Sequence, residues 1–176
     1  MTATLFEPAK AALLVFAAAI LQVTIFSEID IIGGYPDVVL LTLVAIALLR
    51  GSIFGAFAGF WAGFLLDSAT LDTLGVTSLL LTIAGFWIGR YGETTGGDRT
   101  HAPFVSVVVV TVLATFGSLV LAYVLGESAP AAEVLRSLPP TIAINLILTL
   151  PVYVLARRLF PPRDLLDRGR QVRVLG

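Results

Sequence analysis

The sequence predicts an all-α polytopic membrane protein, a single bundle of six transmembrane helices. Of the 176 residues, 57% are hydrophobic and only 13% are charged, whereas soluble domains usually have about 45–50% apolar and about 25% charged residues. The mean hydropathy is +0.97. The apolar residues form long runs that do not alternate with polar ones. Because backbone inside lipid must satisfy its own hydrogen bonds, these runs are expected to be helices rather than barrel strands.

Six apolar segments give the predicted spans. They are separated by polar stretches rich in Gly, Pro, Ser and acidic residues, as connectors usually are. The first segment is interpreted as a span rather than a signal peptide, because its start is weakly charged and no clear cleavage site precedes the acidic loop. The predicted spans cover residues 9–26, 37–49, 51–66, 74–91, 103–125 and 141–160, and residues 161–176 form a basic tail.

The second and third spans are shorter than the roughly 20 residues that cross a bilayer comfortably. Three arrangements are compatible with residues 37–66. They are two short spans joined by a tight Arg50-Gly51 turn, one long tilted helix that contains Arg50, and a re-entrant hairpin. A central arginine costs at least about 2.5–3.5 kcal/mol on insertion scales, which disfavours the single helix. Two short spans are the preferred prediction.

The basic residues predict the orientation of the chain. With six crossings and a cytoplasmic amino terminus, all eleven basic residues except Arg136 fall on the inner side. Basic bias on short cytoplasmic loops is the strongest orientation signal in a sequence. Both termini are therefore predicted to be cytoplasmic. The tail is interpreted as an anchor beside anionic lipid, with a docking site for a cytoplasmic partner as the alternative.

Glycines recur every four residues in the third segment, at Gly51, Gly55, Gly59 and Gly63. A four-residue step advances a helix by about 400°, so these glycines form one stripe along the helix. Small residues on such a stripe allow the backbone of another helix to approach closely. The stripe predicts packing inside the bundle, which is the preferred interpretation, or an interface with a partner helix.

Two aspartates, Asp37 and Asp67, lie at the predicted outer ends of the second and third spans. Asp37 follows Pro36, and a proline and an acid both suit the first turn of a helix. Asp67 is expected to be solvated at a loop start or to accept hydrogen bonds from amides of the 68–73 loop. Two carboxylates without a third ligand are weak grounds for a cation site, so no metal site is predicted.

The remaining polar residues form no catalytic constellation. Gln22 and Asn145 are amides inside the first and last spans, where they are expected to hydrogen-bond across helices. The chain has no cysteine and a single histidine, His101, which excludes thiolate chemistry and any site that needs two histidines. No P-loop, H-E-x-x-H or G-x-S-x-G pattern is present. The sequence predicts no enzymatic activity and no cofactor, and its composition excludes an ordinary soluble nucleic-acid binder.

An ordered set of motifs resembles the rod shape-determining MreD family. The motifs are Leu21-Gln22, Tyr35-Pro36-Asp37, Arg50-Gly51, Gly59-Phe60-x-x-Gly63-x-x-x-Asp67 and Leu74-Gly75. They lie within residues 1–90, and the later half of the chain matches the family in size, span count and a basic end. The resemblance implies a non-enzymatic integral scaffold of the bacterial cell-elongation machinery in the cytoplasmic membrane.

The resemblance also implies partners and a fold. Members of the family are thought to act with MreC, in a complex with MreB filaments, RodA and a class B penicillin-binding protein, and so to regulate cell shape and peptidoglycan synthesis. Their fold is said to resemble the substrate-binding subunits of ECF-type transporters, with a groove open to the outer side. Self-association is also compatible. The residues expected to form the partner-binding or packing surface are Gly51, Gly55, Gly59, Phe60, Gly63, Asp67, Pro36, Asp37, Leu74 and Gly75.

Two other functions are compatible with six short helices. The first is a small-molecule transporter or the substrate-binding subunit of an ECF-type transporter, which would suit the acidic outer loops. Transporters usually bring polar groups together at the bilayer midplane, and here the midplane offers only Gln22, Asn145 and scattered Ser and Thr residues. The second is a general assembly factor with no role in shape. Shape control is the preferred hypothesis.

Overall fold

The chain folds into six α-helices in the computed structural model, which describes residues 3–26, 29, 31, 33–70, 73–95, 101–126 and 131–160. The helices are α1 (Ala3–Thr24), α2 (Val38–Arg50), α3 (Ser52–Thr70), α4 (Val76–Thr95), α5 (Ala102–Val124) and α6 (Ala131–Leu159). Within the described residues no strand is formed beyond an isolated bridge between Ile31 and Gly34. The predicted all-α class is confirmed. The predicted basic tail, residues 161–176, lies outside the described residues.

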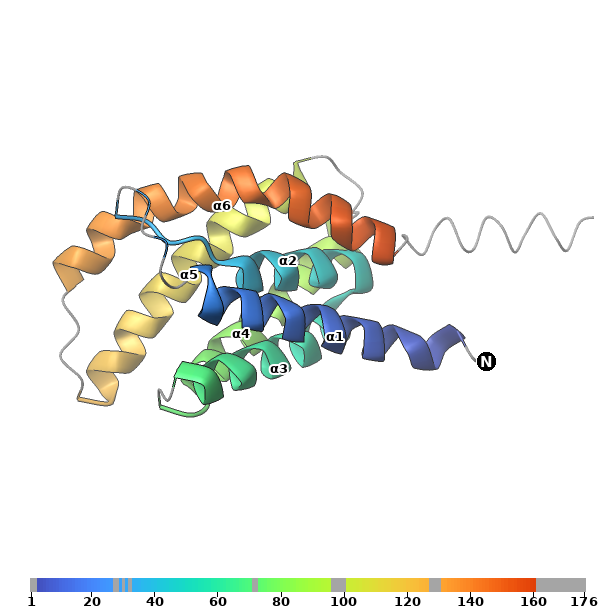
Figure 1. Ribbon diagram of the computed structural model, residues 1–176, viewed down its shortest axis with the longest axis horizontal. Coiled ribbons are helices and arrows are strands. Elements are labelled where there is room, and N and C mark those ends of the chain that lie inside the picture. Colours follow the sequence, from blue (N-terminus) through green and yellow to red (C-terminus); the bar gives the residue numbers. More distant parts are fainter. Residues whose placement is uncertain are drawn as a thin grey trace, which may run out of the picture.

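Successive helices run in opposite directions along one bundle (Figure 1). The start of α1, the junction of α2 with α3 and the last turn of α6 therefore lie together, at what we call the terminal end. The end of α1 and the starts of α2, α4 and α6 lie at the opposite, distal end.

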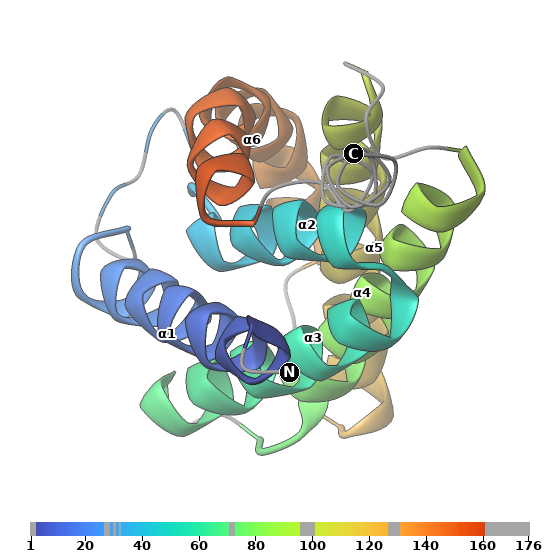
Figure 2. The same ribbon diagram turned by 90° about the vertical axis from the view of Figure 1, so that its right-hand side faces the viewer.

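The second helix, α2, lies at the centre of the bundle and packs against each of the other five helices (Figure 2). Every residue from Val39 to Leu48 is buried. A helix that is hydrophobic on all sides must be covered on all sides, either by protein or by lipid. Here the neighbouring helices cover it. A helix of 13 residues is only about 20 Å long, at about 1.5 Å per residue, and this shielding removes the need for its length to match the bilayer.

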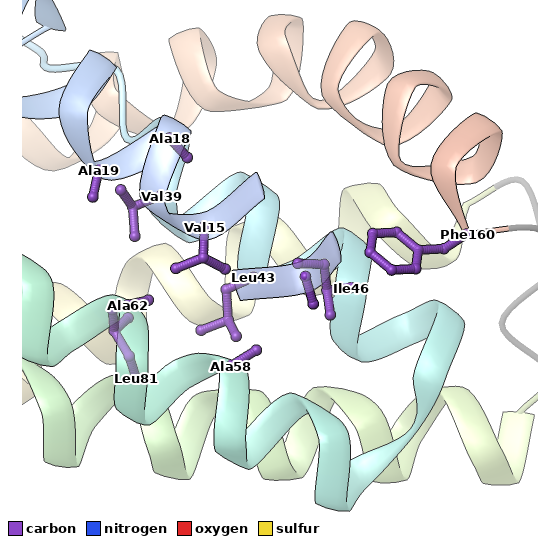
Figure 3. Packing of buried hydrophobic residues seen from close by; sticks show 11 residues of the cluster. Val15, Ala18, Ala19, Val39, Leu43, Ile46, Ala58, Ala62, Leu81 and Phe160 are labelled. Atoms are coloured by element: carbon purple, nitrogen blue, oxygen red, sulfur yellow. The ribbon is translucent and has the colours of Figure 1, made fainter. Parts of the chain in front are cut away.

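Two hydrophobic clusters meet on α2. One side, with Val39, Leu43 and Ile46, packs against α1, α3 and Phe160, as Figure 3 shows. The other side packs against α4, α5 and α6 through Leu40, Leu41, Val44, Ala47 and Leu48. The core is therefore continuous across the bundle, and α2 supplies its middle.

The outside of the bundle is apolar as well. Large hydrophobic side chains such as Ile53, Val124 and Ile147 are more than 70% exposed, and they lie on different helices. Exposed apolar surface of this extent marks contact with lipid or with protein partners. Four helices, α1, α3, α5 and α6, are long and apolar enough to cross a membrane. The helix α2 is shorter, and α4 ends in a polar turn with Arg90 and Glu93, so six crossings remain a prediction.

The helix boundaries differ from the predicted spans mainly in α6. This helix begins at Ala131, ten residues before the predicted start of the sixth span, and it continues through Pro139 and Pro140. The sequence predicts a connector up to Pro139 and Pro140, because proline lacks the N–H of the helical hydrogen bond. The helices α3 and α4 each extend four residues beyond the predicted ends of their spans, to Thr70 and Thr95.

The junction of α2 with α3 is a single residue, Gly51. Its φ of +93° lies in the left-handed region that favours glycine, and its N–H donates to the Ala47 carbonyl at 2.8 Å to close the last turn of α2. The chain reverses at this point, so residues 37–66 do not form one continuous helix. The tight Arg50-Gly51 turn is present as expected.

The glycine stripe of α3 lies against α4. A Cβ added at Gly59 would collide with the carbonyl oxygen of Leu81, and one added at Gly55 would collide with that of Gly85. A Cβ at Gly63 would meet the backbone of Ser78 in the same way. Backbone-to-backbone contact of this kind is what small residues allow between membrane helices. The helix α4 therefore occupies the glycine stripe of α3, and no room is left there for a helix from a partner protein.

Substitution of Gly59 by alanine is expected to destabilise the protein strongly. The added methyl group meets the Leu81 backbone, which cannot rotate away, so the cost should exceed the about 1–3 kcal/mol typical of overpacking against side chains. The measurement is the unfolding midpoint of the purified protein in detergent. The neighbouring Phe57, 67% exposed, gives the control: Phe57→Leu should unfold like the wild type. Equal midpoints for Gly59→Ala and the wild type would contradict the close α3–α4 contact.

Candidate functional site

Polar side chains of the described residues gather at the two ends of the bundle, where they bind the ends of the central helices. No group of three or more His, Asp or Glu residues there could hold a metal ion. A helix leaves about four N–H groups unsatisfied at its start and four carbonyls at its end. In apolar surroundings each of these groups needs a partner, and this requirement explains most of the polar contacts described next.

The segment before α2 is held by side chains from α1 and α6. The Gln22 side chain of α1 donates from Nε2 to the Pro36 carbonyl at 3.0 Å and accepts from the Val38 N–H at 2.8 Å. From α6, Asn145 Oδ1 accepts from the Asp37 N–H at 2.9 Å, and Thr141 Oγ1 accepts from the Tyr35 N–H at 3.2 Å. We call Gln22, Thr141 and Asn145, with the 35–38 segment that they bind, the distal clamp.

Asp37 caps the first turn of α2. Its Oδ1 accepts from the Leu40 N–H at 2.9 Å, the usual geometry of an N-cap aspartate. The negative charge also lies beside the positive end of the helix dipole. Asp37 is thus the N-cap, and it and Pro36 lie just before the first turn in which the sequence placed them. The carboxylate accepts from the helix backbone.

Asn145 is fully buried, and its amide is used on both sides. Besides accepting from Asp37, it donates from Nδ2 to Thr111 Oγ1 of α5 at 3.3 Å. The sequence indicated that Gln22 and Asn145 bond across helices, but not that their main partner is the backbone before α2. The available signal was the Tyr35-Pro36-Asp37 tripeptide itself, because a helix that starts inside an apolar bundle must find acceptors for its first N–H groups.

Asp67 links the end of α3 to the start of α4. Its side chain is 1% exposed. Oδ2 accepts from the N–H groups of Gly75 at 2.8 Å and Ser78 at 3.4 Å, and Oδ1 accepts from that of Thr77 at 3.3 Å. These amides lie just beyond the 68–73 loop in which we expected its partners. Asp67 is a buried cap for α4 rather than a solvated surface acid.

Glu93 caps α3 from the other end of the hairpin. Its Oε1 accepts from the Ser52 N–H at 2.7 Å and from the Ser52 hydroxyl at 3.0 Å. Each helix of the hairpin thus supplies a carboxylate for the first turn of the other. Sequence reasoning did not single out Glu93, because its helical partner is 41 residues away along the chain.

Arg50 is buried at the terminal end, although the sequence placed it in an inner connector. Its guanidinium Nη2 lies 2.7 Å from Glu7 Oε1 of α1, and its Cζ lies 5.3 Å from the centre of the Phe160 ring, just after α6. A buried charge is tolerated when it is paired and hydrogen-bonded, and the aromatic face adds a cation–π contact. We call Glu7, Arg50 and Phe160 the terminal clamp.

Two apolar grooves open on the sides of the bundle. One, of about 440 Å³, lies between α4 and α5 and is lined by residues such as Trp87, Ile88 and Val109. The other, of about 370 Å³, lies between α1 and α3 and is lined by residues such as Ala11, Phe57 and Trp61. No charged side chain lines either groove, and the hydroxyl-bearing residues in their linings are Tyr91 and Ser106 of the first groove.

The structure separates the residues proposed for the partner-binding or packing surface into three groups. The glycines Gly51, Gly55, Gly59 and Gly63 lie in the α3–α4 contact. Phe60 is 49% exposed on α3 and stacks on Phe64. The remaining residues lie at the distal end, where Leu74 and Gly75 are exposed, Pro36 and Asp67 are buried, and Asp37 is half-buried. Tyr35, 48% exposed, is also at this end.

Comparison with known proteins confirms the resemblance stated from the motifs. The model of one protein family, described as rod shape-determining protein MreD, matches residues 9–161, nearly the whole chain. The match begins in α1 and ends just after α6, so it includes both clamps except Glu7. No curated protein and no solved structure matches the chain. The expected likeness to ECF-type substrate-binding subunits therefore stays a prediction.

Replacement of Asn145 by leucine is expected to lower the free energy of unfolding by about 1–3 kcal/mol, the usual cost of a buried donor left without an acceptor. The donor in question is the Asp37 N–H, because leucine has a similar volume but cannot accept its hydrogen bond. Denaturant titration of the purified protein measures the change. Ile147→Leu, on the same helix at a site that is 75% exposed, is the control and should match the wild type.

Replacement of Asp67 by alanine is expected to destabilise the start of α4 by about 1–3 kcal/mol, since the buried Ser78 amide and the less buried Gly75 and Thr77 amides lose their acceptor. The local effect can be followed by amide hydrogen exchange at Gly75, Thr77 and Ser78, which should become faster. Glu133→Ala removes an exposed acid from the first turn of α6 and serves as the control. Unchanged exchange at these amides in Asp67→Ala would show that the cap has no energetic role.

Proposed function

Because the chain belongs to the MreD family of rod shape-determining membrane proteins, we propose that it is a non-enzymatic scaffold of the bacterial cell-elongation complex that binds MreC. The observation that supports this proposal is the family match, which spans the helical bundle from residue 9 to residue 161. In this role the chain regulates cell shape and peptidoglycan synthesis through its partners. These partners are MreC and, in the wider complex, MreB, RodA and a class B penicillin-binding protein.

The shape of the molecule supports a scaffold. Most described residues belong to helices. The part of the chain that the structure describes offers partners mainly its helix faces and the turns at its two ends. The apolar outer surface described above suits both lipid and the single anchor helix of a membrane partner.

The charges support an orientation with both termini in the cytoplasm and the bundle in the cytoplasmic membrane. Lys10, Arg90, Arg157 and Arg158 are all exposed at the terminal end. Basic residues that flank spans are retained on the cytoplasmic side. The acids Asp37 and Asp67 lie at the distal end, which in this orientation faces outward.

We assign the MreC contact to the exposed residues of the distal end, Tyr35 and Leu74. Tyr35 is 48% exposed and Leu74 is 67% exposed. Tyr35 lies two residues before Asp37, the N-cap of α2, and Leu74 lies two residues before the start of α4. Aromatic residues are enriched among the side chains that dominate binding energy. The buried or half-buried residues Pro36, Asp37 and Asp67 then act indirectly, because they hold the backbone of the exposed residues in place.

A transporter or an ECF-type substrate-binding subunit is the less favoured alternative. The centre of the bundle is filled by α2, whose residues from Val39 to Leu48 are at most 5% exposed. All of them are aliphatic except Thr42. The two grooves described above are apolar and open sideways. A site for a polar vitamin would need several convergent polar groups, and these features do not provide them.

The proposal is tested by co-purification of MreC with the tagged chain from membranes. We expect the wild type to retain MreC and a Tyr35→Ala/Leu74→Ala variant to retain at least about tenfold less, which corresponds to about 1.4 kcal/mol. Leu135→Ala, a similarly exposed leucine of α6 (47%), is the matched control. Failure of the wild type to retain MreC would reject the proposed function. Equal retention by all three proteins would reject the assigned surface.

A further inference from the structure

Both ends of α2 are held by the same two neighbours. At the distal end the partners are Gln22 of α1 and the α6 residues Thr141 and Asn145. At the terminal end they are Glu7 of α1 and Phe160, the residue that follows α6. Each clamp therefore joins α1 to α6 through one end of α2.

The helices α1 and α6 have different packing partners apart from α2. The helix α1 packs against α2 and α3, whereas α6 packs against α2 and α5. In Figure 2, α2 lies at the centre, α1 and α6 lie towards the left of it, and α3, α4 and α5 lie below it and towards the right. Besides the packing of both helices against α2, the two clamps join α1 to α6, and α2 is the element that both clamps share.

The middle of α2 is suited to transmit a displacement. It is a regular helix without Gly or Pro, buried on all sides. Close-packed interiors have low compressibility and move between discrete arrangements rather than deforming continuously. A displacement or rotation of α2 that begins at one clamp therefore reaches the other clamp about 20 Å away, at about 1.5 Å per residue.

The geometry points to α2 as a coupling element between the two ends of the bundle. A change in the terminal clamp alters the exposure and mobility of the 35–38 segment, and a change in the distal clamp alters the exposure and mobility of the residues at the terminal end. Such coupling is reciprocal by thermodynamic necessity. The two ends differ in what they offer to partners. The terminal clamp joins Arg50 of α2 to Glu7 of α1 and to Phe160, and the distal clamp holds the exposed Tyr35.

In the orientation of the proposed function, on which this assignment of sides rests, the terminal clamp faces the cytoplasm and Tyr35 faces outward. A cytoplasmic partner that displaces Glu7 at the start of α1, or Phe160, would then change the surface that meets an outer partner. The scaffold would transmit a structural change from one side of the membrane to the other through a displacement of α2, with no small-molecule ligand and no transport.

The absence of cysteine from the chain allows a direct test in the purified protein alone. Tyr35→Cys provides a reporter thiol, and the substitution keeps the backbone N–H at position 35 that donates to Thr141. The rate of maleimide labelling of this thiol measures its exposure. Glu7→Ala or Phe160→Leu in the same protein opens the terminal clamp. Either change should alter the labelling rate at position 35 at least about fivefold, the lower end of usual coupling strengths. Phe160→Leu keeps the ion pair, so it serves if Glu7→Ala does not fold.

Two controls separate coupling from general loosening. Arg90→Gln breaks an exposed ion pair with Glu93 at the same end, where the atoms lie 3.4 Å apart, and it should leave the rate within about twofold, since exposed pairs contribute little. Asp67→Ala removes the acceptor for the start of α4 and belongs to neither clamp. If Asp67→Ala changes the rate at Tyr35→Cys as much as Phe160→Leu does, or if neither terminal-clamp variant changes it, the proposal is overturned.

The reverse experiment places the reporter at the terminal end. Leu159→Cys, at a residue that is 41% exposed, is labelled with and without Gln22→Leu, which opens the distal clamp on the α1 side. We expect a rate change of similar size, at least about fivefold, as reciprocity requires. A change in one direction of the test and none in the other would also overturn the coupling. Because no partner protein is present in either assay, a failure of MreC to bind leaves these results unaffected.

Discussion

The need to satisfy the backbone at both ends of a buried helix determines much of this structure. The helix α2 starts and stops inside the bundle, so its terminal N–H and C=O groups lack the water that usually solvates them. Gln22, Asn145 and Asp37 supply acceptors at its start, and Gly51 turns the chain back at its end. The positions of α1 and α6 follow from these bonds, because each helix must bring its amide side chain to the same short segment.

The α3–α4 hairpin solves the same problem in a different way. Its glycines allow two backbones to touch over several turns, and Asp67 and Glu93 each cap the first turn of the opposite helix. Close contact and reciprocal capping reinforce each other, because the short distance between the helices is what allows each carboxylate to reach across. This hairpin is a compact unit against which α2 packs, and its outward face is largely aromatic, with Phe57, Trp61 and Trp87 exposed.

The sequence was sufficient for the fold class, the Arg50-Gly51 turn and the family, because these depend on local signals such as long apolar runs and a short ordered motif set. It was insufficient for the partners of polar residues. Asn145 and Asp37 are 108 positions apart, and neither periodicity nor spacing relates them. The start of α6 was placed too late because Pro139 and Pro140 usually end helices, whereas here the helix continues through them. Burial of Arg50 likewise depends on Glu7 and Phe160, which meet only in the folded bundle.

The long sequence separation within the distal clamp has a consequence for biogenesis. During synthesis α2 leaves the ribosome early, yet the acceptors on α6 for the segment just before it emerge about a hundred residues later, at Thr141 and Asn145. Until then the 35–38 segment has only its Gln22 contacts from α1, because Thr141 and Asn145 belong to the last helix. The distal clamp can therefore close only after the last helix has been made.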